Sequence, residues 1–480
     1  MAAPLTSQSA TEDGPLYAPR KKIYPQAVKG RFRTLKWTLL GITLGIYYLL
    51  PFVRWDRGPH APDQAVLVDF PGRRFYFFFI EIWPQEVYFL TGLLVLAALV
   101  LFLMNAVAGR IWCGYLCPQT VWTDLFYAVE RWVEGDRRER MRQDSQKLTL
   151  DIVSRKILKH GIWLVIAWWT GGAWVLYFAD APTLVKELAT LQAPAIAYTW
   201  IGILTFTTYV LAGHMREQVC TYMCPWPRIQ AALTDEHALN VTYRYDRGEP
   251  RGSMKKNEAL RREGLPAGDC VDCFQCVNVC PTGVDIRQGL QLDCIQCGLC
   301  IDACDSVMTK LGRPTGLIGY DTDLNVRARI EGKSESRKFV RPRTVFYAVA
   351  IAAVGLIMIG ALAFRDTMGL SVIHDRNPIF VRLSDGSIRN AYTIRVSNKH
   401  LAPRHYTLSV EGLPARLEAI GTEAGSENTA NFSVGPDQTF EARVLLTASD
   451  HVSSATIVTF VLTDAESGEM VRVSDNFRGP

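Results

Sequence analysis

The chain has 480 residues, of which 49% are hydrophobic and 11% aromatic, and its formal net charge is +5. The apolar and aromatic content excludes wholesale disorder, and so mild a charge gives no ground for a nucleic-acid partner. All 12 cysteines lie between residues 113 and 304 and the long segment after them has none, which excludes a secreted scaffold built on disulfides.

The first two strongly apolar segments are Trp37–Val53 and Val87–Ala108, and neither contains a charged residue. As helices, both are long enough to cross a bilayer core of ~30 Å, which needs about 20 residues. The first follows a basic tail over residues 1–36, and no small-residue cleavage site comes after it. We therefore expect an uncleaved membrane anchor rather than a signal peptide.

The first cysteine pair comes directly after the second apolar run, where Cys113 and Cys117 read C-x3-C-P. A spacing of four predicts that both thiols lie on one face of a helix, and the proline suits the start or the end of that helix. Two further apolar runs, Gly161–Ala179 and Ala195–Gly213, are again long enough to span.

A second C-x3-C-P pair, Cys220 and Cys224, follows the fourth run as the first pair follows the second. If both runs leave the membrane on the same side, the four thiols lie at one depth and can form an all-thiolate site. A third iron–sulfur cluster, Cu(I) or a dithiol/disulfide pair would each suit such a site. Packing as buried small hydrophobes is a weaker alternative, because packing does not require the same spacing twice. The candidate catalytic and metal-binding residues are Cys113, Cys117, Cys220 and Cys224.

Eight cysteines between residues 270 and 304 form the strongest pattern in the sequence. They give C-x2-C-x2-C-x3-C twice, and Pro281 follows the first copy. This spacing is typical of bacterial ferredoxins with two [4Fe–4S] clusters, in which the fourth cysteine of each copy ligates the other cluster. The expected ligand sets are Cys270, Cys273, Cys276 and Cys304 for one cluster, and Cys294, Cys297, Cys300 and Cys280 for the other.

Other cofactors are less well supported by the sequence. Zinc sites usually show two C-x2-C pairs separated by a longer gap, which does not match these eight thiols. The sequence has no C-x-x-C-H motif for attached haem and no G-x-G-x-x-G after a strand, so neither covalent haem nor a Rossmann-type nucleotide or flavin site is indicated. A haem between His160 and His214 is an open alternative, although two lone histidines are more often ordinary surface residues.

A fifth apolar run, Val345–Phe364, precedes a cysteine-free segment in which apolar and polar residues alternate between turn residues such as Asp385 and Gly386. Alternation with a period of two and regular turns predicts an antiparallel β-sandwich of about 100 residues. The expected strands are 379–383, 392–396, 406–410, 440–444 and 455–462.

The basic residues predict an orientation. They are abundant before the first run, between the second and third, and before the fifth, whereas the connection between the third and fourth is balanced. Basic segments stay in the cytoplasm, so we expect the N-terminus and the ferredoxin-like region inside and the sandwich outside. The expected parts are a tail (1–36), a four-helix region (37–230), a ferredoxin-like domain with linker (231–343), a fifth helix (344–365) and a β-sandwich (366–480).

Several segments together resemble the FixG/RdxA/CcoG family, in the same order and over nearly the whole chain. They are GRIWCGYLCPQTVWTDLF, ERWVEGDR, the second C-x3-C-P, CIQCGLCIDACD and GRPTGLIGYDT. The resemblance implies an accessory protein for assembling cbb3-type cytochrome oxidase in the bacterial inner membrane, associated with reducing Cu(II) to Cu(I). It also implies that the C-terminal sandwich is immunoglobulin-like.

The expected fold class is therefore a multi-domain membrane protein with a five-helix α-helical bundle, an inserted two-cluster bacterial ferredoxin-like domain and an all-β immunoglobulin-like sandwich. The spacing indicates a membrane-anchored iron–sulfur electron carrier, and the resemblance makes it a cupric reductase. The alternatives are a quinol-linked relay similar to the NapH and NosR membrane ferredoxins, a non-enzymatic copper-binding scaffold, and a redox sensor. Expected partners are membrane lipid, the oxidase assembly machinery and a second copy of the chain, and the electron donor is open.

Overall fold

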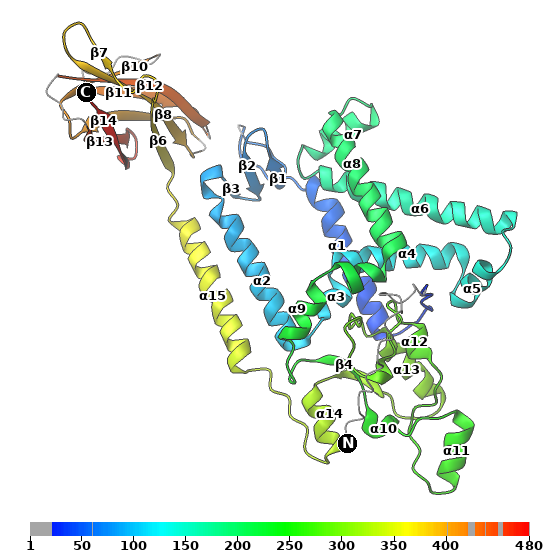
Figure 1. The fold of residues 1–480 in the computed structure, drawn as a ribbon. Coiled ribbons are helices and arrows are strands. Elements are labelled where there is room, and N and C mark those ends of the chain that lie inside the picture. The colour runs from blue at the N-terminus through cyan, green and yellow to red at the C-terminus, as the bar shows by residue number, and fades with distance from the viewer. Residues whose placement is uncertain are drawn as a thin grey trace, which may run out of the picture. The chain divides into compact units, whose positions relative to one another are not determined.

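A computed structural model describes residues 22–59, 61–400, 402–420, 428–436, 438–449 and 455–479 (Figure 1). More than half of the predicted tail, residues 1–21, therefore lies outside the described residues. The chain divides into two units: Met1–Phe52, Val66–Phe75 and Ile82–Gly355 form the first, and Val53–Ala65, Tyr76–Glu81 and Leu356–Pro480 form the second.

The first unit is built mostly from helices. The α-helices of the described chain are α1 Arg31–Leu49, α2 Tyr88–Ala108, α3 Ile111–Tyr115, α4 Pro118–Glu134, α5 Arg137–Ser145, α6 Leu150–Val175, α7 Ala181–Ala189, α8 Ala195–Thr208, α9 Trp226–Leu233, α10 Tyr245–Gly248, α11 Met254–Arg262, α12 Gln275–Asn278, α13 Leu299–Lys310, α14 Asp323–Ile330 and α15 Pro342–Ala363. The π-helical segment η3 Tyr209–Met215 continues from α8, and a second one, η4 Val219–Met223, follows after a break at Arg216. Short 3-10 turns lie at Leu50–Phe52 (η1), Pro84–Glu86 (η2) and Ile286–Gln288 (η5).

Four helical segments among the described residues are long and apolar enough to cross a membrane: Arg31–Phe52, Tyr88–Ala108, Ala195–Met215 and Pro342–Ala363. They cover the first, second, fourth and fifth predicted runs to within one residue. The third run lies mostly in α6, which is not one of the four, so the count of five is not confirmed. The first half of α6 carries charges such as Lys156 and Lys159, and its apolar half is rich in tryptophan and glycine, which lower its mean hydropathy.

Helix α6 nevertheless packs closely within the helical unit. A Cβ atom at Gly171 would lie 2.9 Å from the backbone oxygen of Ile201 in α8, so the missing side chain allows the two helices to approach. On its other side, the ring of Trp163 stacks on Phe126 of α4 at 5.2 Å.

The ferredoxin-like part of this unit is closed by a small sheet. Strand β4 (Asn240–Tyr243) pairs antiparallel with β5 (Ile318–Asp321), so segments before and after the cysteine loops are tied together. Val241, Tyr243 and Ile318 of this sheet share a buried core with cysteines of the two loops. The loops are thus held between a two-stranded sheet and helix α13.

The C-terminal part of the second unit is a two-sheet β-sandwich. One sheet has the order β10-β12-β8-β6, with β7 added to β8, and the other has the order β11-β9-β13-β14. The strands are β6 Met368–His374, β7 Val381–Arg382, β8 Ile388–Asn398, β9 Arg404–Glu411, β10 Ala415–Ile420, β11 Thr429–Val434, β12 Gln438–Ala448, β13 Ala455–Asp464 and β14 Met470–Arg478. Three further strands, β1 Val66–Asp69, β2 Arg74–Phe77 and β3 Ile80–Ile82, form a separate small sheet.

Alternating burial along the strands builds the sandwich core. In β8, Ile394 and Val396 are fully buried and pack with residues such as Val444 and Phe460. Four of the five predicted strands lie within β8, β9, β12 and β13, whereas the predicted strand 379–383 is reduced to the two residues of β7. The sequence reasoning did not anticipate β6, β10, β11 and β14.

Candidate functional site

The two cysteine loops of the ferredoxin-like part have the same backbone geometry. Asp272 and Phe274 have φ angles of 53° and 55°, and Gln296 and Gly298, at the equivalent positions of the second loop, have 55° and 73°. Left-handed residues at such positions turn backbone N–H groups toward one concavity, which suits an anionic group. The repeated conformation therefore fits a pair of thiolate-bound clusters.

The first predicted ligand set lies together in space. Burial raises the pKa of the Cys304 thiol to about 12, and the neighbouring thiols of Cys276, Cys273 and Cys270 raise it further. Thiols affect one another in this way only when they are close. The last cysteine of the second loop, Cys304, also shares a buried cluster with Cys270 and Cys276 of the first loop.

The second predicted set is grouped in the same way. Burial raises the pKa of Cys300 well above its usual value, and the thiols of Cys297, Cys294 and Cys280 add to the shift. The same four residues line a single pocket between the loops. Cys276 of the other set also lines this pocket, so the two groups of thiols are close neighbours.

The two C-x3-C-P pairs also come together, although they are far apart in sequence. Burial raises the pKa of Cys113 to about 12, Arg110 opposes this, and the thiols of Cys117, Cys220 and Cys224 add to it. Burial likewise raises the pKa of Cys220 to about 11. The structure thus forms one group of four thiols next to the ends of two candidate spans.

The prediction that each pair lies on one face of a single helix is wrong. Cys113 lies in α3, but Cys117 is extended and precedes Pro118, the first residue of α4. Cys220 lies in η4, and Cys224 is again extended before its proline. The residue before a proline avoids the helical conformation, whereas proline itself suits the first turn of a helix. Each pair therefore spans the junction between two helices.

No three His, Cys, Asp or Glu side chains in the described part of the chain converge closely enough to hold a single metal ion. Within a cubane cluster each thiolate binds a different iron, so the ligands are spread around the cluster rather than around one ion. The grouping of the eight loop thiols is compatible with this arrangement. The four thiols near the membrane are neighbours but do not form a preformed single-ion site.

Arg110 joins the four-thiol group to the second cysteine loop. Its backbone N–H donates to Oε1 of Gln296 at 2.8 Å, and its guanidinium donates to the backbone oxygens of Cys294, at 3.0 Å, and Leu292. The guanidinium also donates to Oε1 of Gln230, which accepts a hydrogen bond from the Cys113 thiol at 3.2 Å. One arginine and one glutamine therefore connect a loop cysteine to a membrane-side cysteine.

Gly114 brings the same two parts into direct contact. A Cβ atom at this position would lie 2.8 Å from the backbone oxygen of Ile295 and 3.1 Å from Cα of Cys297. A side chain therefore does not fit, and the absence of one lets α3 rest on the loop backbone. The residue that follows Cys113 thus touches a predicted ligand of the second cluster.

The ferredoxin-like part also docks on the first candidate span. Asp302, between Cys300 and Cys304 in α13, accepts hydrogen bonds from the backbone N–H groups of Phe32, at 3.2 Å, and Arg33, at 2.7 Å. These groups lie in the first turn of α1, where no carbonyl of the helix itself is available to them. A carboxylate from the cysteine segment therefore caps a membrane helix.

His160 and His214 lie close together, but not in the way that a haem requires. Their rings stack with centroids 5.7 Å apart and an interplanar angle of 15°, and the hydroxyl of Tyr209 lies 2.9 Å from Nδ1 of His160. Two axial ligands would face each other through their nitrogens with the porphyrin between them, whereas these rings face each other through their flat sides. The haem alternative does not fit this geometry.

The residues that connect the two cysteine sites were not found from the sequence. Arg110 lies three residues before the first C-x3-C-P motif, Gly114 lies inside that motif, and Asp302 lies inside the second ferredoxin copy. The only available signal was their position next to cysteines. Their partners are more than 100 residues away, and no local pattern reveals such contacts.

Comparisons with known proteins agree with the cysteine pattern. A family model described as a 4Fe-4S dicluster domain matches residues 215–323, and one described as a 4Fe-4S binding domain matches residues 89–137. A third, described as the IG-like fold at the C-terminus of FixG, matches residues 358–480. With its apolar helices, the chain is a membrane-associated iron–sulfur electron-transfer protein.

Close relatives extend over nearly the whole chain. The nitrogen fixation protein FixG of Rhizobium meliloti is 50% identical over 92% of this chain and 89% of its own length. Protein RdxA of Cereibacter sphaeroides is 51% identical over 97% and 99%, and RdxB of the same organism is 54% identical over 85% and 88%. The chain belongs to the FixG/RdxA family. A crystal structure of a FixG-related protein from Vibrio parahaemolyticus matches 24% of this chain and 97% of its own, with 29% identity and a TM-score of 0.20.

Proposed function

We propose that the chain relays electrons from two [4Fe–4S] clusters to the four-thiol group and there reduces Cu(II) to Cu(I). Cys270, Cys273, Cys276 and Cys304 hold one cluster, and Cys294, Cys297, Cys300 and Cys280 hold the other. When bound, each cluster stores a single electron, which matches the one-electron reduction of copper. The grouping of Cys304 with the first loop and of Cys280 with the second supports these exchanged ligand sets.

One observation carries the route of the relay. Helix α3, which contains Cys113, rests through Gly114 on the backbone of Cys297, and Arg110 ties the same loop to Gln230 beside the Cys113 thiol. The second cluster site and the four-thiol group are therefore joined by direct contacts rather than by a flexible linker. Buried, fixed contacts hold the geometry between the two sites constant.

The four thiols are the point at which copper receives its electron. Thiolates are soft ligands that favour Cu(I) over Cu(II), so binding there assists the reduction. The 4Fe-4S binding-domain model covers Cys113 and Cys117 and supports a third cluster, which the same four residues would hold and which would supply the electron for Cu(II). The iron content separates the two cases, because two cubanes give about eight iron atoms per chain and three give about twelve.

The membrane arrangement belongs to the same proposal. Five helices cross the bacterial inner membrane, with α6 as the third span despite its lower hydropathy. The tail and the ferredoxin-like part face the cytoplasm, as the basic residues before the first and fifth runs favour. The IG-like domain faces the periplasm, where its lack of cysteine suits an oxidising compartment.

The Cu(I) formed supplies the copper centre of a cbb3-type cytochrome oxidase during its assembly. This role rests on membership of the FixG/RdxA family and on the one-electron chemistry of the relay. The IG-like domain is then the part that contacts a periplasmic assembly partner or a second copy of the chain. Crosslinking in membranes distinguishes these two cases: an assembly partner gives a product with another protein, and a second copy gives a dimer of this chain.

The experiment is an anaerobic reduction of the purified full chain with dithionite, removal of the excess, and addition of Cu(II) with a chelator specific for Cu(I). Two reduced clusters should give about two Cu(I) per chain while the iron–sulfur absorbance returns to its oxidised form. No Cu(I) beyond that formed by a cluster-free sample would refute the reductase. Iron analysis and EPR of the same sample count the clusters.

The ligand sets have their own test. Substitution of Cys304→Ser should change the EPR signal of the cluster held by the first loop, and Cys280→Ser that of the second. Serine replaces the thiolate by a harder oxygen ligand, which alters the cluster it binds. If each substitution changed the signal of its own loop's cluster instead, the exchange of fourth ligands would be wrong.

A further inference from the structure

An apolar groove runs between α6 and α8 at the depth of a candidate membrane span. It has a volume of about 620 Å³, which is within the range of small-molecule sites. Its walls include Leu164, Trp168, Tyr198 and Phe206, and Phe206 is 67% exposed. Because α8 belongs to a candidate span, an opening lined by such side chains faces lipid.

The groove ends at a polar group of aromatic residues. His214 and Tyr209 line it, with ring centroids 5.1 Å apart, and the Tyr209 hydroxyl lies 2.9 Å from Nδ1 of His160. Imidazole and phenol groups accept and donate protons as well as hydrogen bonds. The occupant of the groove therefore has an apolar body and a head group that exchanges hydrogen bonds or protons.

A second, polar pocket begins on the other side of the histidines. It has a volume of about 370 Å³. His160 and His214 line it, and Glu130, Lys159 and Glu217 form other parts of its wall. Carboxylates and ammonium groups beside the histidines provide a route by which protons reach water.

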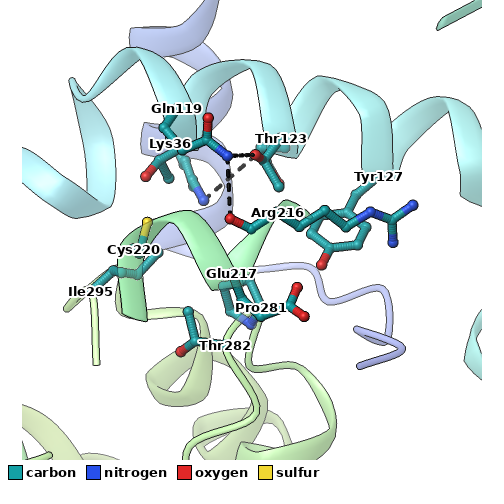
Figure 2. A pocket seen from close by; sticks show the side chains of 12 residues that line it. Lys36, Gln119, Thr123, Tyr127, Arg216, Glu217, Cys220, Pro281, Thr282 and Ile295 are labelled. Carbon is teal, nitrogen blue, oxygen red and sulfur yellow. Dashed lines mark hydrogen bonds and ion pairs between the residues drawn. The ribbon is translucent and has the colours of Figure 1, made fainter. Parts of the chain in front are cut away.

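A third pocket joins this route to the cysteines. Arg216 and Glu217 line both the polar pocket and the pocket that contains Cys220. Figure 2 shows Cys220 and Ile295 at this third pocket together with Arg216 and Glu217. Three adjoining cavities thus lead from a lipid-facing groove, through a pair of histidines, to the four-thiol group.

We propose that the groove binds a lipid-soluble quinol and that its head group is oxidised at His214, His160 and Tyr209. The inference names the electron donor of the proposed function and rests on that function. The two O–H bonds of the quinol break, the two protons pass by the histidines to the polar pocket, and the two electrons leave one at a time past Cys220 to the clusters that feed the relay, since Pro281 and Ile295 of the cysteine loops line the same pocket. The overall reaction is QH₂ + 2 Cu(II) → Q + 2 Cu(I) + 2 H⁺, which balances in atoms and charge.

A quinol fits the three cavities better than a membrane lipid does. A lipid tail would fill the apolar groove but would make no use of stacked histidines with a hydrogen-bonded tyrosine at its end. A quinol has two hydroxyl groups for this end and an isoprenoid chain for the groove. The step also requires separate exits for protons and electrons, which the polar pocket and the Cys220 pocket provide.

The test uses the full chain in detergent and a benzoquinol that carries a decyl tail. Binding of the oxidised quinone is followed by quenching of tryptophan fluorescence, since Trp168 lines the groove. Electron transfer is followed as bleaching of the iron–sulfur absorbance by the quinol without copper. The variant Gly202→Phe fills the groove, because Gly202 lines it and a Cβ atom there meets nothing within 4 Å. Gly41→Phe in α1, also with nothing within 4 Å, is the matched control.

The expected result is saturable quenching and quinol-driven bleaching in the unaltered chain and in Gly41→Phe. Both should weaken at least about tenfold in Gly202→Phe, which keeps its iron content. Equal binding and bleaching in the two variants would overturn the proposal. It would also be overturned if the quinone quenched the fluorescence, the quinol caused no bleaching, and an ordinary phospholipid displaced the quinone equally well. Clusters that dithionite reduces and quinol does not would also overturn it and leave the copper reductase standing. Failure of the dithionite-reduced chain to form Cu(I) would instead refute the reductase.

Discussion

The contact between Gly114 and the second cysteine loop gives a prediction of definite sign. Replacing Gly114 by alanine adds a Cβ atom 2.8 Å from the backbone oxygen of Ile295 and 3.1 Å from Cα of Cys297, where ordinary contacts are 3.4–4 Å. Every atom that the new methyl group meets belongs to the backbone, so no side chain can rotate out of the way. Helix α3 must move away from the loop.

The magnitude follows from two opposing effects. Alanine in place of glycine within a helix favours folding by about 1 kcal/mol, and overpacking in a tight contact costs about 1–3 kcal/mol. The matched variant is Gly161→Ala in α6, where the new Cβ atom meets nothing within 4 Å and only the favourable effect acts. The free energies of unfolding of the two variants should therefore differ by about 2 kcal/mol, with Gly114→Ala the less stable.

The assay is the temperature at which the iron–sulfur absorbance of the purified chain is lost. A difference of about 2 kcal/mol corresponds to roughly 3 °C in a unit of more than 300 residues. We expect Gly114→Ala to lose its absorbance at the lower temperature and to pass electrons to Cu(II) more slowly, because Cys113 moves with α3. A midpoint for Gly114→Ala equal to or above that of Gly161→Ala would refute the packing argument.

Three more predictions concern the contacts around the two sites. Asp302→Asn weakens the cap on α1, because a neutral amide offers one oxygen in place of the carboxylate that accepts from both Phe32 and Arg33, and should cost about 1 kcal/mol in thermal unfolding. Arg110→Lys replaces a planar group that reaches several acceptors by a single ammonium, and should alter the EPR signal of the second cluster while leaving the first unchanged. Glu130→Gln leaves the buried Arg216 without its counter-charge and should cost about 3–5 kcal/mol in thermal unfolding.

The ion pairs of Glu130 also predict a pH dependence. Burial alone would raise the pKa of Glu130, but the guanidiniums of Arg216 and Arg140 outweigh it and hold that pKa below its usual value. A carboxyl whose pKa is lower in the folded state stabilises the fold above its unfolded pKa, and the contribution is lost as the pH falls through the folded value. The thermal midpoint of the unaltered chain should thus fall on acidification more steeply than that of Glu130→Gln.

Each of these expectations can fail on its own terms. An unchanged midpoint for Asp302→Asn would mean that the cap on α1 contributes nothing. If Arg110→Lys changed the EPR signals of both clusters equally, Arg110 would have no specific effect on the cluster of the second loop. Parallel pH profiles for the unaltered chain and Glu130→Gln would show that another group sets the acid limit.

The cluster ligands and the membrane spans could be predicted from the sequence, because cysteine spacing and long apolar runs are local patterns. The exchange of fourth ligands was predicted from the spacing and stays a prediction, and in the structure Cys304 shares a buried cluster with Cys270 and Cys276, while Cys280 lines one pocket with Cys294, Cys297 and Cys300. Five apolar runs were predicted to span because lipid requires about 20 apolar residues in a row, and four of them correspond to candidate spans of the structure, whereas the third lies mostly in α6. Helix α6 was harder, since tryptophans lower its mean hydropathy while Gly171 packs it against α8.

Long-range contacts could not be found from local patterns. Asp302 caps a helix that lies about 270 positions earlier in the chain, and its role depends on how the cysteine loops fold. The cysteine pairs near the membrane were predicted to be helical because four residues make about one turn, but a new helix begins at Pro118 after the first pair and directly after Pro225 following the second. In the sandwich, β10, β11 and β14 are defined by the strands that they pair with as much as by their own sequence.

The central claim is that electrons reach copper through the four thiols near the membrane. The most direct measurement mixes the dithionite-reduced full chain rapidly with Cu(II) and follows the iron–sulfur absorbance, for the unaltered chain and for the variant with Cys113, Cys117, Cys220 and Cys224 all changed to serine. Tyr222→Ser, between two of these cysteines and 66% exposed, is the matched control. The account predicts rapid reoxidation in the unaltered chain and the control, and loss of reoxidation in the fourfold variant while the eight loop cysteines keep their iron. Reoxidation of the fourfold variant at the unaltered rate would contradict it.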